Sequence, residues 1–493
     1  MTSSLLRPPP SAEAGDSRFV KLQRLAKSWA MASEEVVSDT IAKLMTLFAS
    51  RGSRVWLLGS SARASLAIRA SVEVDLLTDA STESIASVLA DDLVSGASEP
   101  IYVASLGELS LPDRLATFGF SIDAIAIDLA DGTVTDPHGG VAHLASGSIR
   151  TIAAPDTAFR DDPVLLLRFA RLVSETGFVA SSELRRLATR DAGNILDTRH
   201  RHAEWGGELN RLLAGAHIER ALQLLLETRL LAFLMPEVAA LVGFDKTCSV
   251  HHKDIWEHTK LVTQKSTPDP VVRWTALCHD IGKIWTRSVT KGGKVHFFRH
   301  EEHGALLFEG IAHRVGLAPA LAKRVSYVIE NHSRVNLYQD EWTDSAVRRL
   351  IRDTGGHLPD LIAFSKADFT TKREAKIAEL KRQMTELEVR IERIVREDAT
   401  PAPLSKGIGV AIMEHFGLRP SRLVGELKRL LEVAIDAGEL PARGDDATYL
   451  AWFDGQPELL ARVAAESTST ERPTPPGSVA SSGTRAGIIE AAA

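Results

Sequence analysis

The sequence predicts an α+β protein in which a small sheet-containing head is followed by helical regions. Two observations carry this prediction. Short apolar runs that are typical of strands, 55–58 and 72–77, occur near the N-terminus on either side of a Gly-Ser turn. From about residue 165 onward, apolar residues recur at helical intervals. The length of 493 residues allows about three domains.

Composition excludes several classes of protein. The net charge is −6, with 58 basic and 64 acidic residues, so the whole chain is no basic nucleic-acid coat, although a local basic face could still bind RNA. Two cysteines, Cys248 and Cys278, provide neither a disulfide framework nor a thiolate metal site, which fits a reducing cytoplasm. The sequence has no apolar run of about eighteen residues and no apolar core of signal length, so we expect no membrane role.

In chain order, we expect disordered tails at 1–17 and 464–493 and a head over 18–155. Apolar spacing over 19–49 predicts helix. In the following strand pattern, Glu73 and Asp75 fall on one face, where two carboxylates can share magnesium ions beside the Gly59-Ser60 turn. The alternative is an ordinary polar face on an edge strand.

Residues 156–243 are expected to form a helical neck, with a buried helix over 221–234 that ends at Pro236. This region is rich in arginine. The basic residues indicate either an RNA-backbone site or a solvated helix face, and the pattern leaves both open. They are Arg185, Arg186, Arg190, Arg199, Arg201 and Arg211.

Polar residues with metal-ligand chemistry gather between residues 244 and 372. An adjacent His279-Asp280 pair follows His258 by about twenty residues, and Asp368 lies far downstream. Mixed imidazole and carboxylate ligands suit a divalent metal that activates water. His300 and His332 are further candidates on apolar helical patterns. For any one of these histidines, the alternative is a hydrogen-bonded core residue. His251, His252 and His303 are expected to be surface residues.

The order of these residues resembles the HD superfamily of metal-dependent phosphohydrolases, whose pattern is H, then HD, then further His residues, then D. The resemblance implies that one divalent ion (Mn, Ni, Fe or Mg) is held by the first four ligands and that the last two hold a second ion or the substrate phosphate. It also implies that His279 and Asp280 are catalytic. The two sets are His258, His279, Asp280 and Asp368, and then His300 and His332.

A long amphipathic helix is predicted over 374–397, opening a C-terminal helical domain at 373–463. Its apolar residues alternate at intervals of three and four, which is typical either of a coiled-coil seam in a homodimer or of packing against the chain's own helices.

The head resembles the tRNA nucleotidyltransferase and poly(A) polymerase family. Residues 57–63 are similar to the family's Gly-Gly turn with a downstream Arg, and residues 73–80 are similar to its D-x-D motif. Further family segments match 120–126, 136–140, 147–150, 159–163, 417–420, 424–428 and 437–440. Several bacterial members carry an HD domain after the transferase head, in the position seen here.

This resemblance implies a mixed-sheet nucleotidyltransferase head in which Glu73 and Asp75 are catalytic carboxylates that hold magnesium. It also implies that a tRNA-like RNA binds the neck and the C-terminal region. The nucleotide would be contacted by Gly59, Ser60, Arg63, Asp162 and Arg168.

Five departures from the family pattern concern one nucleotide pocket. The first carboxylate is Glu73 where the family has Asp, and 117–119 reads Thr-Phe-Gly where the family has R-R-D. Leu165 and Trp205 replace arginines, and Ala64 replaces an Asp. Each lost charge-assisted bond costs about 1.5–3 kcal/mol, so the pattern predicts a head that folds but no longer selects nucleotides in the family's way.

Two hypotheses follow. In the first, the chain transfers nucleotides from NTP to RNA 3′ ends, and the HD site trims phosphates from RNA ends or small nucleotides. In the second, it is an HD-type phosphohydrolase or phosphodiesterase whose head and neck only bind RNA or a nucleotide. The first depends on Glu73 and Asp75, the second on His279.

Overall fold

The computed structural model describes residues 39–66, 74–89, 101–244, 254–291, 294–370, 373–399, 403–405, 407–459, 461 and 463. Two compact units make up the chain, 1–389 and 390–493. Several predictions lie outside the described residues: both tails, most of the helix expected over 19–49, Glu73, and the surface histidines His251 and His252.

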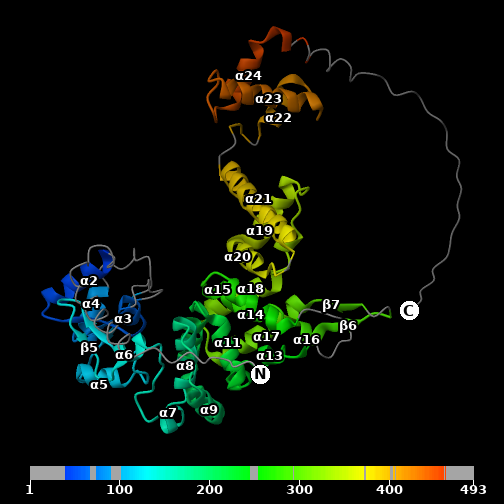
Figure 1. The fold of residues 1–493 in the computed structure, drawn as a ribbon. Helices are drawn as coiled ribbons and strands as arrows, with labels where there is room; N and C mark the ends of the chain where they lie inside the picture. The colour runs from blue at the N-terminus through cyan, green and yellow to red at the C-terminus, as the bar shows by residue number, and fades with distance from the viewer. Residues whose placement is uncertain are drawn as a thin grey trace, which may run out of the picture. The chain divides into compact units, whose positions relative to one another are not determined.

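The head is a five-stranded mixed sheet with short helices (Figure 1). Its strand order is β3-β2-β1-β4-β5, with only β2 and β3 parallel. Its elements are α2 (Asp39–Ser50), β1 (Val55–Leu58), α3 (Gly59–Leu66), β2 (Val74–Thr78), α4 (Thr82–Leu89), β3 (Ile101–Ser105), α5 (Leu111–Ala116), β4 (Ala126–Asp128), β5 (Val134–Thr135), α6 (Gly140–Ala145) and α7 (Pro155–Asp161).

Side chains alternate across this sheet and divide its core into two clusters. Leu57 and Leu76 face the cluster that contains residues of α2 and α4, whereas Trp56 and Leu77 face the cluster beside α5. Asp75 is next to Leu76 on β2, so period-two alternation places it on the face of Leu77. The head therefore presents its predicted catalytic carboxylate on the side that α5 covers.

From Leu165 the first unit is helical. The elements are α8 (Leu165–Thr176), α9 (Ser182–Asp191), the 3₁₀ segment η2 (Ala192–Arg201), α10 (His202–Ala214), α11 (Ile218–Glu227), α12 (Leu230–Leu234), α13 (Pro236–Ala239), α14 (Ile255–Lys265), α15 (Pro270–Cys278), α16 (Lys283–Thr286), β6 (Arg287–Val289), β7 (Val295–Phe297), α17 (His300–Val315), α18 (Pro319–Asn331), η4 (Val335–Leu337), α19 (Asp344–Thr354), η5 (Gly355–His357) and α20 (Leu358–Asp368).

The single helix predicted over 221–234 is wrong, because the structure divides this stretch into α11 and α12. The Thr228 hydroxyl donates to the Leu224 carbonyl at 2.8 Å, and Arg229 takes a left-handed conformation (φ 64°). Apolar periodicity continues through this turn, so the sequence pattern could not reveal it. The helical stretch does end just before Pro236, as predicted, because α12 closes at Leu234 and Met235 is already non-helical.

The α+β class is confirmed, and the structure adds one element to the helical region. An antiparallel ribbon of β6 and β7 pairs Arg287 with Phe297 and Val289 with Val295. In Figure 1 the ribbon projects from the helical body beside α16 and α17. It lies between the end of α16 at Thr286 and the start of α17 at His300.

The long helix predicted over 374–397 is α21 (Glu374–Ala399). Within the first unit, Met384 and Leu387 are buried, and Lys366 pairs with Glu388 at 2.6 Å, so this part packs against the chain's own helices. The second unit contains α22 (Ile408–Phe416), α23 (Arg422–Asp436) and α24 (Asp446–Asp454) around one apolar core. Among the described helices, none is both long and apolar enough to cross a membrane.

Candidate functional site

Five helices present the predicted metal ligands, mostly at their ends. α14 begins after Asp254, whose carboxylate accepts a hydrogen bond from the Glu257 N–H, and His258 lies in its first turn. The capped start of α15 at Asp269 fixes the helix whose C-terminal end carries His279 and then Asp280. His300 opens α17, His332 follows α18, and Asp368 closes α20. The helix ends point these side chains to one place.

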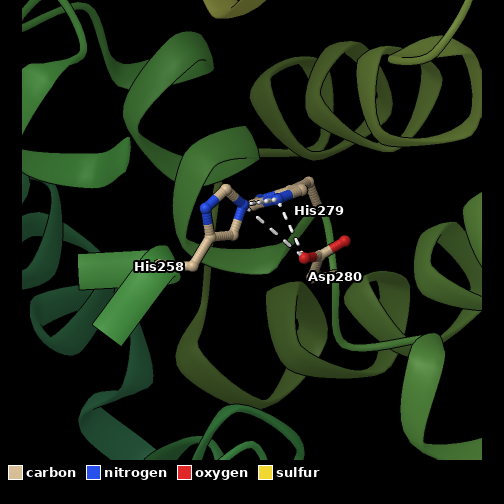
Figure 2. A group of neighbouring side chains, drawn as sticks. All are labelled: His258, His279 and Asp280. Carbon is tan, nitrogen blue, oxygen red and sulfur yellow. Dashed lines mark hydrogen bonds and ion pairs between the residues drawn. The ribbon is translucent and has the colours of Figure 1, made fainter. Parts of the chain in front are cut away.

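The ligand atoms lie close together. His258 Nε2 is 3.3 Å from His279 Nε2 and 3.2 Å from Asp368 Oδ1. Asp280 Oδ2 is 3.2 Å from His279 Nε2 and 3.8 Å from His258 Nε2, and Figure 2 shows these three side chains converging. On the other side, Asp280 Oδ1 is 3.9 Å from His300 Nε2. All six predicted residues are therefore brought together, with Asp280 between two groups of ligands.

Each of the four histidines uses Nδ1 in an outer hydrogen bond. Nδ1 contacts the Ala276 carbonyl in His279, the Phe297 carbonyl in His300 and the Ile329 carbonyl in His332, at 3.0, 3.0 and 2.6 Å. His258 Nδ1 lies 3.0 Å from the Thr370 hydroxyl. A carbonyl accepts only from an N–H, so Nδ1 carries the proton in those three rings and Nε2 keeps its lone pair. This arrangement is the one that metal-bound histidines adopt.

Charge at the centre is balanced around one buried carboxylate. Burial would raise the pKa of Asp280, but His279 and Lys283 hold that pKa well below its usual range. Burial would lower the pKa of His279, but Asp280 raises it above its ordinary value. Burial lowers the pKa of His332 to about 4, so this imidazole is neutral near pH 7. The cluster thus presents an anionic carboxylate from Asp280 beside a neutral imidazole from His332.

The donor set fits a divalent cation. The ligand atoms of His258, His279 and Asp280 lie within 4.8 Å of one another, and so do those of Asp280, His300 and His332. Donors that are each 2.0–2.2 Å from one cation are roughly 3 Å apart, close to the shorter separations found here. Mixed imidazole and carboxylate ligands favour Fe, Ni, Mn or related ions.

Two outer residues escaped the sequence reasoning. Lys283 Nζ lies 2.8 and 2.9 Å from the two carboxylate oxygens of Asp280, and Thr370 holds the outer nitrogen of His258. Lys283 stands three residues after Asp280, so its proximity at the helix end could have been anticipated. Nothing in the sequence signals Thr370, because its role depends on how α20 meets α14.

In the head, Asp75 lies beside the Gly59-Ser60 turn. Its Oδ2 accepts from the Ser60 hydroxyl at 3.0 Å, and Gly59 has φ +52°. A Cβ at Gly59 would stand 3.5 Å from the same oxygen. Arg211, from neck helix α10, donates to both Ser60 Oγ and Asp75 Oδ2, at 2.8 and 3.0 Å. A guanidinium therefore contacts one oxygen of the carboxylate that the predicted magnesium would need.

Arg63, predicted to bind a nucleotide, is buried within an ion-pair network. Its guanidinium pairs with Asp123 and Glu175, and burial lowers its pKa to about 10. Arg171 joins the same network, donating to Asp123 at 2.7 Å and to Glu208 at 2.7 Å. These contacts connect the head to α8 and α10. A nucleotide-binding role for Arg63 stays a prediction, and it would require these pairs to open.

Apolar residues fill the positions where the family pattern has charge. Leu165 is buried against Gly119, which has a φ of +81°. Gly119 leaves room for the Leu165 side chain because it has no Cβ, and a Cβ at this position would overlap Leu165. Phe118 packs in the cluster beside α5 and comes within 3.8 Å of the Cβ position of Gly59. Trp205 is fully buried and donates its indole N–H to Thr198 at 3.1 Å. These replacements are parts of a packed interior.

The other two predicted nucleotide-binding residues lie near each other at the start of the neck. Asp162 accepts from Arg201 at 2.8 Å, and Arg168 donates to Glu208 at 3.1 Å. Arg168 and Asp162 are themselves 4.0 Å apart. Both side chains are half-buried and already paired within the protein, so their role toward a nucleotide stays a prediction.

We expect Asp123→Asn to lower the free energy of unfolding by about 1–3 kcal/mol, because it removes a buried charge that two arginines share. Urea unfolding followed by circular dichroism measures the change. Asp131→Asn is the matched control, since Asp131 is exposed and only distantly paired with Arg54, and it should leave the midpoint unchanged. Equal midpoints for the two variants would show that the network does not stabilise the head.

The fold and the two clusters define an α+β protein with a nucleotidyltransferase-like head and a helical domain with a candidate metal centre. Two family profiles match the helical part. Residues 207–241 match a region described as the probable RNA and SrmB-binding site of polymerase A. Residues 255–394 match the HD domain, and this range includes all six predicted ligands.

Curated relatives agree with these matches. An A-adding tRNA nucleotidyltransferase of Deinococcus radiodurans is 29% identical over 343 residues, which cover 67% of this chain and 76% of that protein. A multifunctional CCA protein of Pasteurella multocida is 30% identical over 241 residues, covering 46% of this chain and only 56% of that protein. The solved CCA-adding enzyme of Bacillus stearothermophilus with CTP is 20% identical, with a TM-score of 0.46 over 88% of this chain and 100% of that one.

The chain is similar to members of the tRNA nucleotidyltransferase and poly(A) polymerase family, in the form that carries an HD domain.

Proposed function

We propose that this protein is a metal-dependent phosphohydrolase or phosphodiesterase that acts at its HD site on RNA ends or nucleotides, while its head and neck hold RNA. One observation carries the proposal. Six ligand residues from five helices converge, with each histidine turning Nε2 inward and Nδ1 outward. Burying several inward-facing ring nitrogens without a partner costs free energy, and a bound cation would remove that cost.

The ligands divide into two groups that share Asp280. His258, His279, Asp280 and Asp368 would hold one divalent cation, and Asp280 with His300 and His332 would hold a second cation or the substrate phosphate. A divalent cation at such a site polarises a phosphoryl oxygen and lowers the pKa of a coordinated water. Mn, Ni, Fe and Mg are the ions that we propose to test there.

The protein's own groups would do the remaining work. Lys283 neutralises Asp280 and places an ammonium group at the centre, where it would attract a phosphate. His300 and His332 are neutral near pH 7, because burial lowers the pKa of each, so their Nε2 atoms can bind a cation. Phe364 lies against the His279 and His332 rings and shields one side of the cluster from water.

Hydrolysis tests this proposal and is followed as inorganic phosphate released from the monoesters and as p-nitrophenol released from the diester. The full-length protein, stripped with chelator, is incubated with a 3′-phosphorylated oligoribonucleotide, with nucleoside monophosphates and with bis(p-nitrophenyl) phosphate. We expect activity to return with Mn, Ni, Fe or Mg. No hydrolysis of any substrate with any of these ions would overturn the proposal.

Nucleotidyl transfer at the head is a second candidate. Asp75 remains beside the Gly59-Ser60 turn, and with Glu73 it would hold magnesium and an NTP for attack by an RNA 3′ hydroxyl. Against it stand the Arg211 contact on Asp75 and the buried Leu165. The named activities of the relatives support this candidate, and the chain spans only about half of several of them.

We expect no incorporation of radiolabelled CTP or ATP into tRNA that lacks its 3′ end, beyond the level of an Asp75→Ala variant. The family pattern has arginines at 117, 118, 165 and 205 that this sequence lacks, and each charge-assisted contact from such a group is worth about 1.5–3 kcal/mol. The assay uses magnesium and the full-length protein. Incorporation that disappears in Asp75→Ala would show that the head transfers nucleotides despite the departures.

We also propose a reducing cytoplasm as the location, because two cysteines offer no disulfide framework and Cys278 is buried as a free thiol. A homodimer through α21 stays a proposal. Val389 is 62% exposed on that helix, an apolar side chain that a second copy could cover.

A further inference from the structure

The segment that enters the HD site has an unusual charge. From Lys283 to His300, both included, the sequence contains five Lys or Arg residues and neither Asp nor Glu, in a chain whose net charge is −6. Within the described residues, Lys291 and Lys294 are exposed and form no ion pair. The acidic residues that follow this segment are already engaged, because Glu302 pairs with Arg299 and Glu301 accepts from Ser333 at 2.8 Å. A polyanion would therefore meet positive charge here.

The same segment exposes aromatic rings. Trp285 is 71% exposed and Phe298 is 70% exposed, both at the base of the β6–β7 ribbon, where β6 begins and β7 ends. Phe298 stacks on His296 with ring centres 5.0 Å apart and planes within 6°. Because the two residues are separated by one position, they share a face of the ribbon. This stack is a flat platform open to solvent, and exposed rings beside positive charge are what single-stranded nucleic acids bind.

Covalent connections place the ribbon beside the metal ligands. Lys283, which opens α16, contacts Asp280, and its ammonium lies 5.7 Å from the centre of the Phe297 ring on β7. Phe298 is only two residues from His300, so the two Cα atoms lie within about 7 Å. Figure 1 shows the ribbon leaving the helical body at α16 and α17. The platform therefore lies next to the ligand cluster along the chain, two residues before His300.

We propose that the β6–β7 ribbon is a docking surface for single-stranded RNA, which stacks its bases on Trp285 and on the Phe298–His296 pair and contacts Lys291 and Lys294 through its phosphates. The inference deepens the proposed function, because it names a strand with several nucleotides as the substrate class of the HD site. RNA is favoured over an anionic membrane surface, since the platform adjoins ligands suited to phosphate chemistry and its rings stack in parallel.

Binding is measured by fluorescence anisotropy with a labelled oligoribonucleotide of about ten nucleotides. In the full-length protein, Trp285→Ala combined with Phe298→Ala should raise Kd at least about tenfold, since each stacked base contributes strongly. Val289→Ala is the matched control, because Val289 is 57% exposed on the same ribbon but has no ring, and its Kd should equal that of the wild type. All substituted side chains are exposed, so the fold should persist, as circular dichroism checks.

A second variant tests the phosphate contacts separately. Lys291→Ala combined with Lys294→Ala should weaken binding and make the slope of log K against log salt shallower by about 1.4, the value for two lost single-strand phosphate contacts. Unchanged affinity in the aromatic variant, or tighter binding to vesicles of anionic lipid than to RNA, would overturn the proposal. Equal binding of duplex RNA would also overturn it, because paired bases cannot stack on the platform.

The binding measurement is independent of turnover. If RNA affinity falls in the ribbon variants while no substrate is hydrolysed, the docking surface stands and the proposed hydrolase fails. If bis(p-nitrophenyl) phosphate is hydrolysed but the variants bind RNA like the wild type, the hydrolase stands and the docking surface fails. If the docking surface and the hydrolase both stand, the ribbon variants should have a lower kcat/KM than the wild type for RNA and an unchanged kcat/KM for bis(p-nitrophenyl) phosphate.

Discussion

Replacing His279 with alanine is expected to lower phosphate release by well over 100-fold. Its Nε2 lies 3.3 Å from His258 Nε2 and 3.2 Å from Asp280, so its loss opens the first ligand group. Loss of an outer partner alone commonly costs 10–100-fold, and loss of the ligand itself should cost more. Added Mn or Ni should also raise the melting temperature of the wild type, but raise that of His279→Ala much less.

Two further variants make this result interpretable. His279 is only 2% exposed, so its removal could disturb packing, whereas Asp368→Asn changes a partly exposed ligand with little change of shape. It should reproduce the loss of activity and of stabilisation by the ion. His303→Ala is the control, because His303 lies one turn from His300 on α17 but is exposed. Full activity in His279→Ala and Asp368→Asn would rule out the HD centre as the site of hydrolysis.

The six metal-ligand candidates could be predicted from the sequence because their order is a chemical pattern that survives without coordinates. The position of Asp280 between two ligand groups could not be predicted. It depends on α17 and α18 approaching α15 from the other side, which spacing along the chain does not encode. The outer hydrogen-bond partners differ in the same way. The carbonyls of Ala276 and Phe297 lie three residues before the histidines that they contact, so they are predictable, whereas Thr370 is 112 residues from His258.

For the head, the sequence predicted which charges are missing but not what replaced them. Leu165 reads as a lost arginine, yet only the fold shows that Gly119, 46 residues earlier, makes space for it. Arg211 was grouped with the basic residues of the neck. Its contact with Asp75 spans 136 residues, so sequence periodicity carries no trace of it. The departures from the family pattern at Gly119 and Leu165 look independent in the sequence, but the two residues contact each other in the fold.

Elements were hardest to predict where a short local signal competed with a longer pattern. The β6–β7 ribbon was missed because its strands have three residues each, and this is too short for period-two alternation to stand out against neighbouring helices. The break between α11 and α12 was missed for a similar reason. By contrast, α21 has 26 residues of regular spacing and was predicted correctly.

We expect Gly282→Ala to lower the free energy of unfolding of the first unit by about 3 kcal/mol and the hydrolytic rate by roughly 100-fold. A Cβ at Gly282 would lie 2.7 Å from the backbone nitrogen of Gly304 and closer still to the His300 carbonyl oxygen. Neither backbone atom can rotate away, so α16 and α17 must separate. That movement shifts His300 relative to Asp280, two residues before the substitution.

Gly310→Ala is the matched control on the same helix pair. Gly310 is exposed within α17, and nothing lies within 4 Å of its Cβ position, so alanine should stabilise the helix by up to about 1 kcal/mol and leave hydrolysis unchanged. Urea unfolding and phosphate release measure both variants. If Gly282→Ala retains wild-type stability and rate, the close packing of α16 against α17 does not hold the two ligand groups in place. If it loses activity but keeps stability, the contact acts on the geometry of the centre alone.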